Sequence, residues 1–195
     1  MTGLIISGLP ASGKGTQCKK VASEYGLAHL DTGENLRQEI AQESTLGLEA
    51  KKFIAQGKLV PDTLIQKIMV KVMGRYPSGQ GFVFDGFPRT IGQARMLEDF
   101  GKEYNLHISG MIYLKVREEQ IIERIRKRAQ EAGRRDDQDP DIIQKRIQGQ
   151  RKQLVDLKAF YQEREKYYEV DGMGDVAEVF DQIRKIIEHQ GLLKE

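Results

Sequence analysis

The feature that most constrains the fold is a glycine-rich turn between an apolar run and a helical segment. The run "LIIS" (residues 4–7) leads directly into "GLPASGKGT" (residues 8–16), and "KGTQCKKVASEY" can open a helix. A turn of this kind aims backbone N–H groups and a helix N-terminus at one point, where an anion can bind. Glycines allow the close approach, and Lys14 would reach outer phosphates as a point charge. The stretch predicts a phosphate site in an α/β fold; the alternative is a plain turn with a solvated lysine.

The turn departs from the general phosphate-binding pattern at one position. That pattern has Ser or Thr directly after the lysine, whereas this chain has Gly15 there and Thr16 one place later. The loop therefore predicts that the chain binds phosphates but does not indicate which reaction it catalyses. Evidence for the reaction has to come from the rest of the sequence.

Short apolar runs alternate with longer helical patterns along the chain. Residues 4–7, 82–85 and 110–116 read as buried strands, and 27–30 and 167–170 as weaker strand candidates. Between them, the apolar residues of 64–73 repeat at helical spacing after Pro61, and Asp139 with Pro140 predicts the start of another helix. The alternation predicts a parallel sheet covered by helices.

Two segments fit this alternation poorly and are expected to be insertions at the rim. Residues 31–60 look helical with no strand, and residues 129–139 are a polar stretch, "AQEAGRRDDQD". The remainder forms one α/β core, because 195 residues are ample for a single large hydrophobic core.

Composition excludes several classes of function. The formal charge is +2 with acidic and basic residues mixed along the chain, so no nucleic-acid arm is expected. The single cysteine, Cys18, excludes an internal disulfide and a four-cysteine zinc site, and we expect it to be a small buried residue. His29, His107 and His189 lack metal or triad spacing and are interpreted as structural. No apolar stretch predicts a secretory signal or a membrane span, so we expect a cytosolic protein.

Five segments in order resemble the adenylate kinases, a family of nucleoside monophosphate kinases in which Gly commonly follows the lysine of the loop. After "GLPASGKGTQ", the matching segments are "HLDTGENLR" (29–37), "GKLVPD" (57–62), "GFVFDGFPRTIGQA" (81–94), "ERIRKR…GRRDD…DIIQKRI" (123–147) and "VDGMGDVAEVF" (170–180). Together they cover essentially the whole chain.

The resemblance implies a fold and a division into parts. The fold is a parallel P-loop sheet flanked by helices, with a small helical insertion that binds the nucleoside monophosphate and a short lid. It implies a core at 1–30, 61–126 and 138–195, the insertion at 31–60 and the lid at 127–137. This lid has no cysteine or histidine cluster, so the zinc-bound lid of some family members is not expected.

The reaction implied by the resemblance is MgATP + AMP ⇌ 2 ADP, with Mg²⁺ as the cofactor and a monomer as the family default. ATP and AMP together carry about six negative charges. Magnesium, Lys14 and five arginines would bring about eight positive charges, with arginine gripping phosphate oxygens through two donors. The attacking AMP oxygen is already anionic, so we expect no general base.

The resemblance also implies the residues of the site. The catalytic residues are Lys14, Arg37, Arg89, Arg128, Arg134, Arg146 and Asp85. The ATP-binding residues are Ala11, Ser12, Gly13, Lys14, Gly15, Thr16, Arg124, Arg128 and Gly174. The AMP-binding residues are Thr32, Arg37, Lys58, Leu59, Val60, Gly86, Phe87, Pro88, Arg89, Gln93, Arg134 and Arg146.

Several assignments have simpler structural alternatives. Asp85 is expected to reach Mg²⁺ through water, with no direct protein ligand to the metal; the alternative is a carboxylate that caps the following turn. Asp136 and Asp137 are expected to pair with lid arginines, although a solvated run of charges is nearly as plausible. Any single arginine could also be a solvated surface charge.

The choice of base rests on Gln93, which offers a donor and an acceptor together and matches the family's adenine-contacting glutamine. UMP/CMP kinases are the nearer alternative, but they tend to have Asn-rich sequence after "GFPR", unlike residues 90–92 here. A nucleotide-binding module without transfer activity is the farther one. Three departures from the family pattern are Asp31 in place of Ser, Glu34 in place of Asp, and Ala11 where Gly is frequent.

Overall fold

A parallel sheet of five strands forms the centre of the molecule. The computed structural model describes residues 1–55, 60–132 and 140–193. The strands lie in the order β2-β3-β1-β4-β5 and every neighbouring pair is parallel. Their bounds are β1 Thr2–Gly8, β2 Ala28–Asp31, β3 Phe82–Asp85, β4 His107–Lys115 and β5 Tyr167–Asp171.

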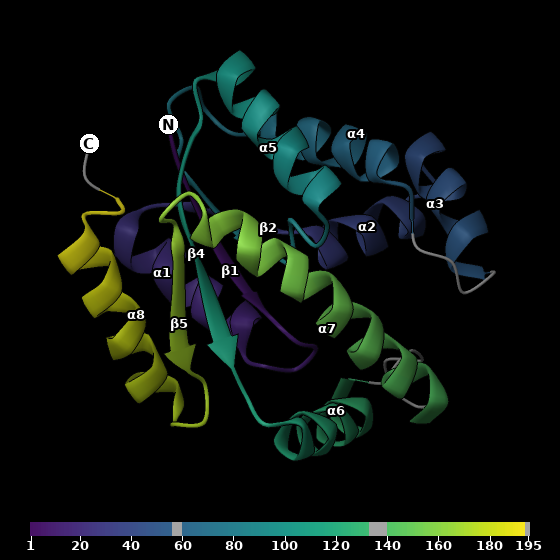
Figure 1. Ribbon diagram of the computed structural model, residues 1–195. Coiled ribbons are helices and arrows are strands. Elements are labelled where there is room, and N and C mark those ends of the chain that lie inside the picture. Colours follow the sequence, from purple (N-terminus) through teal and green to yellow (C-terminus); the bar gives the residue numbers. More distant parts are fainter. Residues whose placement is uncertain (56–59, 133–139, 194–195) are drawn as a thin grey trace.

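Helices cover both faces of this sheet, as Figure 1 shows. On one face, α1 (Lys14–Tyr25) and α8 (Val176–Gln190) pack against β1, β3 and β4 through a buried apolar cluster. On the other, α4 (Asp62–Met73), α5 (Ile91–Tyr104) and α7 (Pro140–Gln162) enclose the larger cluster. The predicted class, a parallel sheet flanked by helices, is confirmed.

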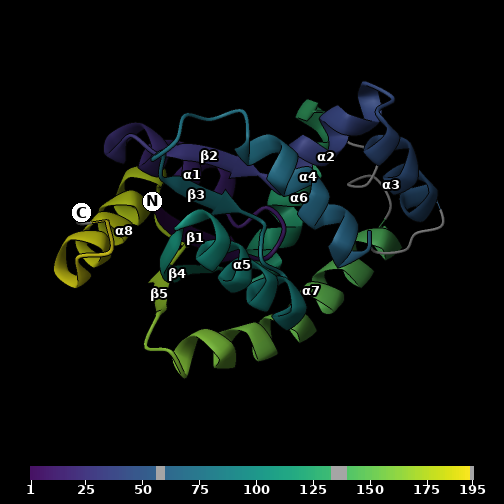
Figure 2. The ribbon, with the colours of Figure 1, turned by 90° about the horizontal axis from the view of Figure 1, so that it is seen from above.

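Three helices lie outside these layers. Helices α2 (Thr32–Ala41) and α3 (Thr45–Ala55) project beyond the end of β2, to one side of the sheet in Figure 2. Helix α6 (Glu118–Ala132) follows β4 and packs on the first half of α7 through Ile121, Ile125, Ile143 and Ile147.

All five strand predictions are confirmed, including the two weaker ones. The largest difference is at β4, which begins at His107 instead of 110, because His107 and Ile108 already pair with Thr2 and Gly3 of β1. Helix α7 begins at Pro140 as predicted, since a proline tolerates the first helical turn. The predicted N-cap Asp139 lies outside the described residues.

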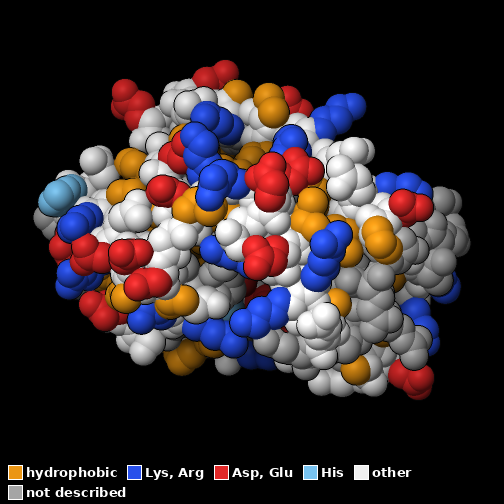
Figure 3. Space-filling view, turned by 90° about the horizontal axis from the view of Figure 1, so that it is seen from below, with side chains coloured by type: hydrophobic (Ala, Val, Ile, Leu, Met, Phe, Trp, Pro, Cys, Tyr) orange, Lys and Arg blue, Asp and Glu red, His pale blue; other side chains and the backbone are white. Residues whose placement is uncertain are grey.

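The parallel arrangement brings all five carboxyl ends to one edge of the sheet. Gly8 ends β1, Asp31 ends β2 and Asp85 ends β3; Asp31 and Asp85 are register partners. Ligands of open α/β sheets bind beyond this edge. Figure 3 shows the molecule from the side toward which the strand arrows of Figure 1 point, with Lys and Arg side chains gathered beside a hollow.

Candidate active site

The loop between β1 and α1 has the backbone conformation that its glycines predict. Gly13 is the N-cap of α1 with φ of 94°, a left-handed value that L side chains rarely adopt. Ala11, which stands where the family often has Gly, has φ of 57°. Ser12 Oγ is buried and has no hydrogen-bond partner among the described residues. A buried hydroxyl without a partner fits a loop that awaits a ligand oxygen.

Gly15 lies against Asp85, which explains the departure from the general loop pattern. A Cβ atom at Gly15 would stand 3.2 Å from Asp85 Oδ2. A serine or threonine here would therefore crowd a buried carboxylate. Glycine lets the first turn of α1 approach the end of β3 closely.

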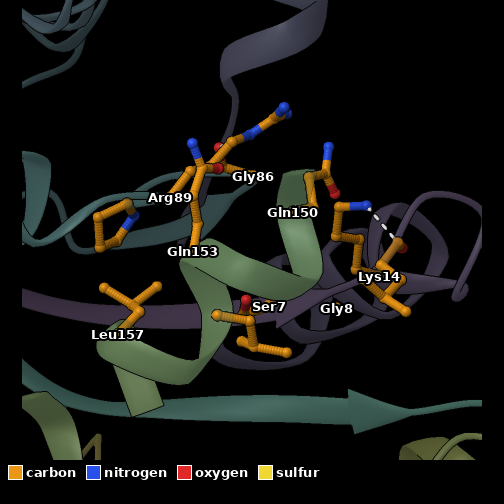
Figure 4. A pocket seen from close by; sticks show the side chains of 11 residues that line it. Ser7, Gly8, Lys14, Gly86, Arg89, Gln150, Gln153 and Leu157 are labelled. Atoms are coloured by element: carbon orange, nitrogen blue, oxygen red, sulfur yellow. Dashed lines mark hydrogen bonds between the residues drawn. The ribbon is translucent and has the colours of Figure 1, made fainter. Parts of the chain in front are cut away.

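Lys14 extends from the first turn of α1 toward the same edge. Its ammonium donates to the Leu9 carbonyl at 3.3 Å, the dashed line in Figure 4. Burial lowers the pKa of Lys14 to about 8; the negative charge of Asp85 raises it, and Arg89 and Arg128 lower it further. The ammonium thus stands among other cations, where an anionic ligand would stabilise its charged form.

Asp85 is 4% exposed at the end of β3. Its Oδ2 lies 3.3 Å from His29 Nε2, in a contact whose donor depends on the histidine tautomer. The ligand atoms of Cys18, His29 and Asp85 all lie within 4.8 Å of one another. The sequence interpretation of His29 as merely structural missed this contact. The pairing of β2 with β3 places residue 29 near the end of β3, and only this pairing indicates that His29 contacts Asp85.

The described part of the insertion brings Thr32 and Arg37 beside this edge. Thr32 is buried, and its hydroxyl donates to Met69 Sδ at 3.6 Å. Arg37 donates from Nη2 and Nε to Glu34 Oε2 at 2.8 and 3.1 Å. Asp31 is the N-cap of α2 and accepts from the Glu34 N–H at 2.9 Å. Both acidic departures from the family pattern thus have local structural roles.

The segment after β3 turns sharply and carries Arg89. Gly86 has φ of 74°, Phe87 is buried, and the Phe87–Pro88 peptide bond is cis. Arg89 Nε donates to the Gly86 carbonyl at 2.7 Å. The turn therefore holds Arg89 at the mouth of the sheet edge, close to Lys14.

Gln93, in the first turn of α5, is 7% exposed and makes a hydrogen bond at each end of its side-chain amide. Its Oε1 accepts from the Arg89 N–H at 2.8 Å, and its Nε2 donates to Asp62 Oδ1 at 2.7 Å. Asp62 was not among the predicted residues. Its only sequence signal is its place as the last residue of the matching segment "GKLVPD" (57–62).

Two arginines of α6 were predicted for the ATP side. Arg124 donates to the Ser12 carbonyl at 3.4 Å and to the Gly172 carbonyl at 3.3 Å, so it joins the loop to the segment after β5. Arg128, one turn further along α6, is part-buried. Gly174 lies against Glu178, whose Oε2 would be 2.7 Å from an added Cβ.

One pocket connects the loop, the turn after β3 and α7 (Figure 4). Lys14 lines it from α1 and Arg89 from the turn. Gln150 and Gln153 line it from α7, and sequence reasoning missed both. The sequence signal for Gln150 and Gln153 was their helical spacing of three and four residues to Leu154 and Leu157, which places all four on one face of the helix. The lining residues are Ser7, Gly8, Leu9, Lys14, Gly86, Pro88, Arg89, Gln150, Gln153, Leu154 and Leu157.

Some predicted residues lie outside this description. Lys58, Leu59, Arg134, Asp136 and Asp137 fall outside the described residues, and the side chain of Arg146, in α7, is also outside them. Among the described residues, no helix is long and apolar enough to cross a membrane.

Comparison with known proteins agrees with this geometry. The family model described as Adenylate kinase matches residues 6–166. The adenylate kinase of Bacteroides fragilis is 40% identical over 188 residues, which cover 96% of this chain and 99% of the relative. That of Phocaeicola vulgatus is 38% identical with the same coverage, and that of Bartonella bacilliformis 38% identical over 190 residues, covering 95% and 99%. These matches do not favour the UMP/CMP kinase alternative. The chain belongs to the adenylate kinase family.

Proposed function

We propose that this member of the family catalyses MgATP + AMP ⇌ 2 ADP at the carboxyl edge of the sheet. One observation carries the proposal: Lys14 from the loop, and Asp85 and Arg89 from the end of β3 and the turn after it, come together at this edge, where Lys14 and Arg89 line one pocket. The pocket lies between the P-loop, which suits the ATP phosphates, and the turn after β3, which suits the AMP phosphate.

The ATP side consists of the loop residues 11–16 with Arg124, Arg128 and Gly174. The buried, unpartnered Ser12 hydroxyl and the N-terminus of α1 fit phosphate oxygens. Arg124 bridges the loop and the segment after β5, which supports a place beside the adenine of ATP.

The AMP side consists of Arg37 and Arg89 together with the residues that the resemblance assigns to AMP: Thr32, Lys58, Leu59, Val60, Gly86, Phe87, Pro88 and Gln93. Arg37 is held by Glu34 at 2.8 Å. Both side chains are about half exposed, so this ion pair is weak and can yield to a phosphate dianion. Both Arg37 bonds go to one oxygen of Glu34, so binding of AMP would exchange this partner for a more highly charged one with several oxygens.

Transfer depends on alignment and on neutralisation of charge. The attacking AMP oxygen needs no base, so Lys14 and the arginines act by holding the phosphates in line and stabilising the charge that develops. Arg134 and Arg146 complete the clamp by the resemblance. Closure of the lid (127–137) and the insertion (31–60) over the core would exclude water and protect ATP from hydrolysis.

The residues present fit a magnesium ion held mainly by the nucleotide. The Asp85 carboxylate is a hard oxygen ligand, buried at the edge beside the P-loop, and would hold the ion through water. When bound, Mg²⁺ neutralises phosphate charge during transfer.

We propose that the protein is a monomer and that it is located in the cytoplasm. Large exposed apolar side chains in the described part include Leu48 and Ile54 on α3, Val155 on α7 and Val176 on α8. Scattered apolar residues do not make a partner surface.

The test is phosphoryl transfer from MgATP to AMP, CMP, UMP and GMP in parallel, with nucleotides separated and quantified. We expect a strong preference for AMP and a large loss of transfer in Lys14→Met. Preference for CMP or UMP would overturn the base assignment, and absence of transfer to every acceptor would favour a binding module.

The lid clamp has its own test. Arg134→Ala is expected to lower the transfer rate at saturating substrates by about 100-fold or more, because it removes one charge stabiliser. An unchanged rate would contradict the clamp.

A further inference from the structure

A hydrogen-bond chain links the starts of α4 and α5, which lie side by side in Figures 1 and 2. Asp62 opens α4, and its Oδ1 accepts from Gln93 Nε2 at 2.7 Å. Its Oδ2 accepts from the Thr90 hydroxyl at 3.0 Å. On the other side, Gln93 Oε1 accepts from the Arg89 backbone N–H at 2.8 Å.

These partners allow the Gln93 amide one orientation only. A backbone N–H can only donate and an ionised carboxylate can only accept, whereas an amide does both at opposite ends. Turning the amide over would set its NH₂ against the Arg89 N–H and its oxygen against Asp62. Gln93 is 7% exposed, so water cannot readily relieve these two mismatches.

The fixed amide still has capacity to bind a base. Oε1 keeps one lone pair and Nε2 keeps one N–H after the bonds to Arg89 and Asp62. A 6-aminopurine presents an N–H donor at its amino group beside an acceptor at N1, which this amide can match. A 6-oxopurine presents an acceptor at O6 beside a donor at N1, which would require the amide turned over.

We propose that Asp62 is a positioning residue that selects AMP over IMP and GMP by holding Gln93 in one orientation. The inference rests on the proposed role of Gln93 at the base of the monophosphate. Asp62 itself does not touch the substrate; it sets which edge of the purine Gln93 can read.

The test is the ratio of kcat/KM for AMP to that for IMP, measured on one preparation with MgATP as donor. In Asp62→Asn the new side chain can donate as well as accept, so the turned amide meets one mismatch instead of two. We expect the ratio to fall about tenfold, because an unsatisfied group in a buried site costs on the order of that factor. Because both substrates see the same enzyme, partial misfolding cancels in the ratio.

Two variants give the controls. Thr90→Val removes the other hydrogen bond to Asp62 and the α5 cap but keeps the Asp62–Gln93 bond, so it is expected to lower the thermal midpoint and leave the ratio unchanged. Gln93→Leu removes the amide that is proposed to contact the base, and it is expected to abolish most of the discrimination between AMP and IMP. If Asp62→Asn does not fold, Asp62→Ala supplies the comparison, because without the carboxylate the turned amide meets only the mismatch at the Arg89 N–H.

The outcomes separate the inference from the function beneath it. A collapsed ratio in Gln93→Leu with an unchanged ratio in Asp62→Asn overturns the role of Asp62 and leaves base reading by Gln93 intact. An unchanged ratio in Gln93→Leu overturns the base-reading role, and the inference with it. If the AMP-to-IMP ratio falls equally in Thr90→Val and Asp62→Asn, the loss of selectivity comes from general loosening of the structure. That result would also overturn the role of Asp62.

Discussion

At the scale of single residues, the P-loop shows how function and stability oppose each other. Lys14 is a cation in a part-buried place with Arg89 and Arg128 nearby, and its pKa is lowered to about 8. Burying a charge among like charges destabilises the ligand-free protein. The same arrangement makes the site attract nucleotide phosphates.

The lowered pKa predicts a pH dependence of ATP capture. In the proposed site the charged form of Lys14 binds phosphate, and above pH 8 the free enzyme increasingly holds the neutral form. We expect kcat/KM for ATP to fall by up to about tenfold per pH unit beyond this point, since kcat/KM reports the free enzyme. Lys14→Arg, which stays charged, should remove the decline. A wild-type profile that stays flat to pH 9.5 would contradict the assignment.

Gly15 gives a second prediction at this scale. In Gly15→Ala the new Cβ would lie 3.2 Å from Asp85 Oδ2, and the carboxylate would have to shift toward His29. We expect kcat to fall about tenfold, because small displacements of aligned groups are costly. Steady-state kinetics check this, with Gly149→Ala as control, since an added Cβ there meets nothing within 4 Å. Equal kcat values in both variants would show that Gly15 is not required for this approach.

At the scale of elements, the α2–α3–α4 unit is held by a buried carboxylate. Glu39 of α2 is 2% exposed and pairs with Lys71 and Arg75 at 2.7 and 3.4 Å, and it accepts from the Ser44 hydroxyl. A Cβ at Gly47 would lie 2.0 Å from the Glu39 carbonyl oxygen, so α3 packs closely on α2. Helices α2 and α3 are therefore tied to α4 and the residues after it through the ion pairs of one buried carboxylate.

This ion pair predicts acid-sensitive stability. Hydrogen bonds from Lys71 and then Ser44 hold the pKa of Glu39 below the ordinary 4.5. The stabilisation is therefore present above pH 4.5 and is lost as pH falls through the lower folded-state pKa. We expect Glu39→Gln to lower the free energy of unfolding by about 1 kcal/mol at pH 7, since its cationic partners are half exposed. Urea unfolding across pH checks this; a difference from wild type that persists undiminished in acid would contradict it.

At the scale of the whole molecule, a nearly neutral chain concentrates cations at one edge. The formal charge is only +2, yet Lys14, Arg37, Arg89, Arg124 and Arg128 all come from segments at the carboxyl ends of the strands. Acidic neighbours such as Asp85 and Glu34 offset part of this charge, and bound phosphates would offset more of it. Ligand-free and nucleotide-bound protein should consequently differ in stability.

We expect MgATP and AMP each to raise the thermal midpoint. At 100 times its Kd, either ligand adds about 2.7 kcal/mol to the free energy of unfolding. In Lys14→Met the shift with MgATP should shrink strongly while the shift with AMP remains, because Lys14 belongs to the P-loop. Scanning fluorimetry measures both shifts. Equal loss of the two would indicate that the ATP and AMP regions are not separate.

Much of this could be predicted from the sequence. Buried strands are apolar on both faces, and the glycine-rich turn has a local backbone requirement, so both leave short-range signals such as "LIIS" and "GLPASGKGT". The sheet class, all five strands, the start of α7 and the convergence of Lys14 with Asp85 and Arg89 followed from such signals. The family motifs assigned the reaction.

Only the tertiary structure decided how those residues meet. Register between β2 and β3 sets His29 beside Asp85, and the packing of α1 on β3 makes Gly15 necessary. The Asp62–Gln93 bond spans 31 residues, and Gln150 and Gln153 reach the pocket from another layer. Little in the local sequence reveals such contacts, because they form between segments that are far apart along the chain and adjacent only in the folded structure.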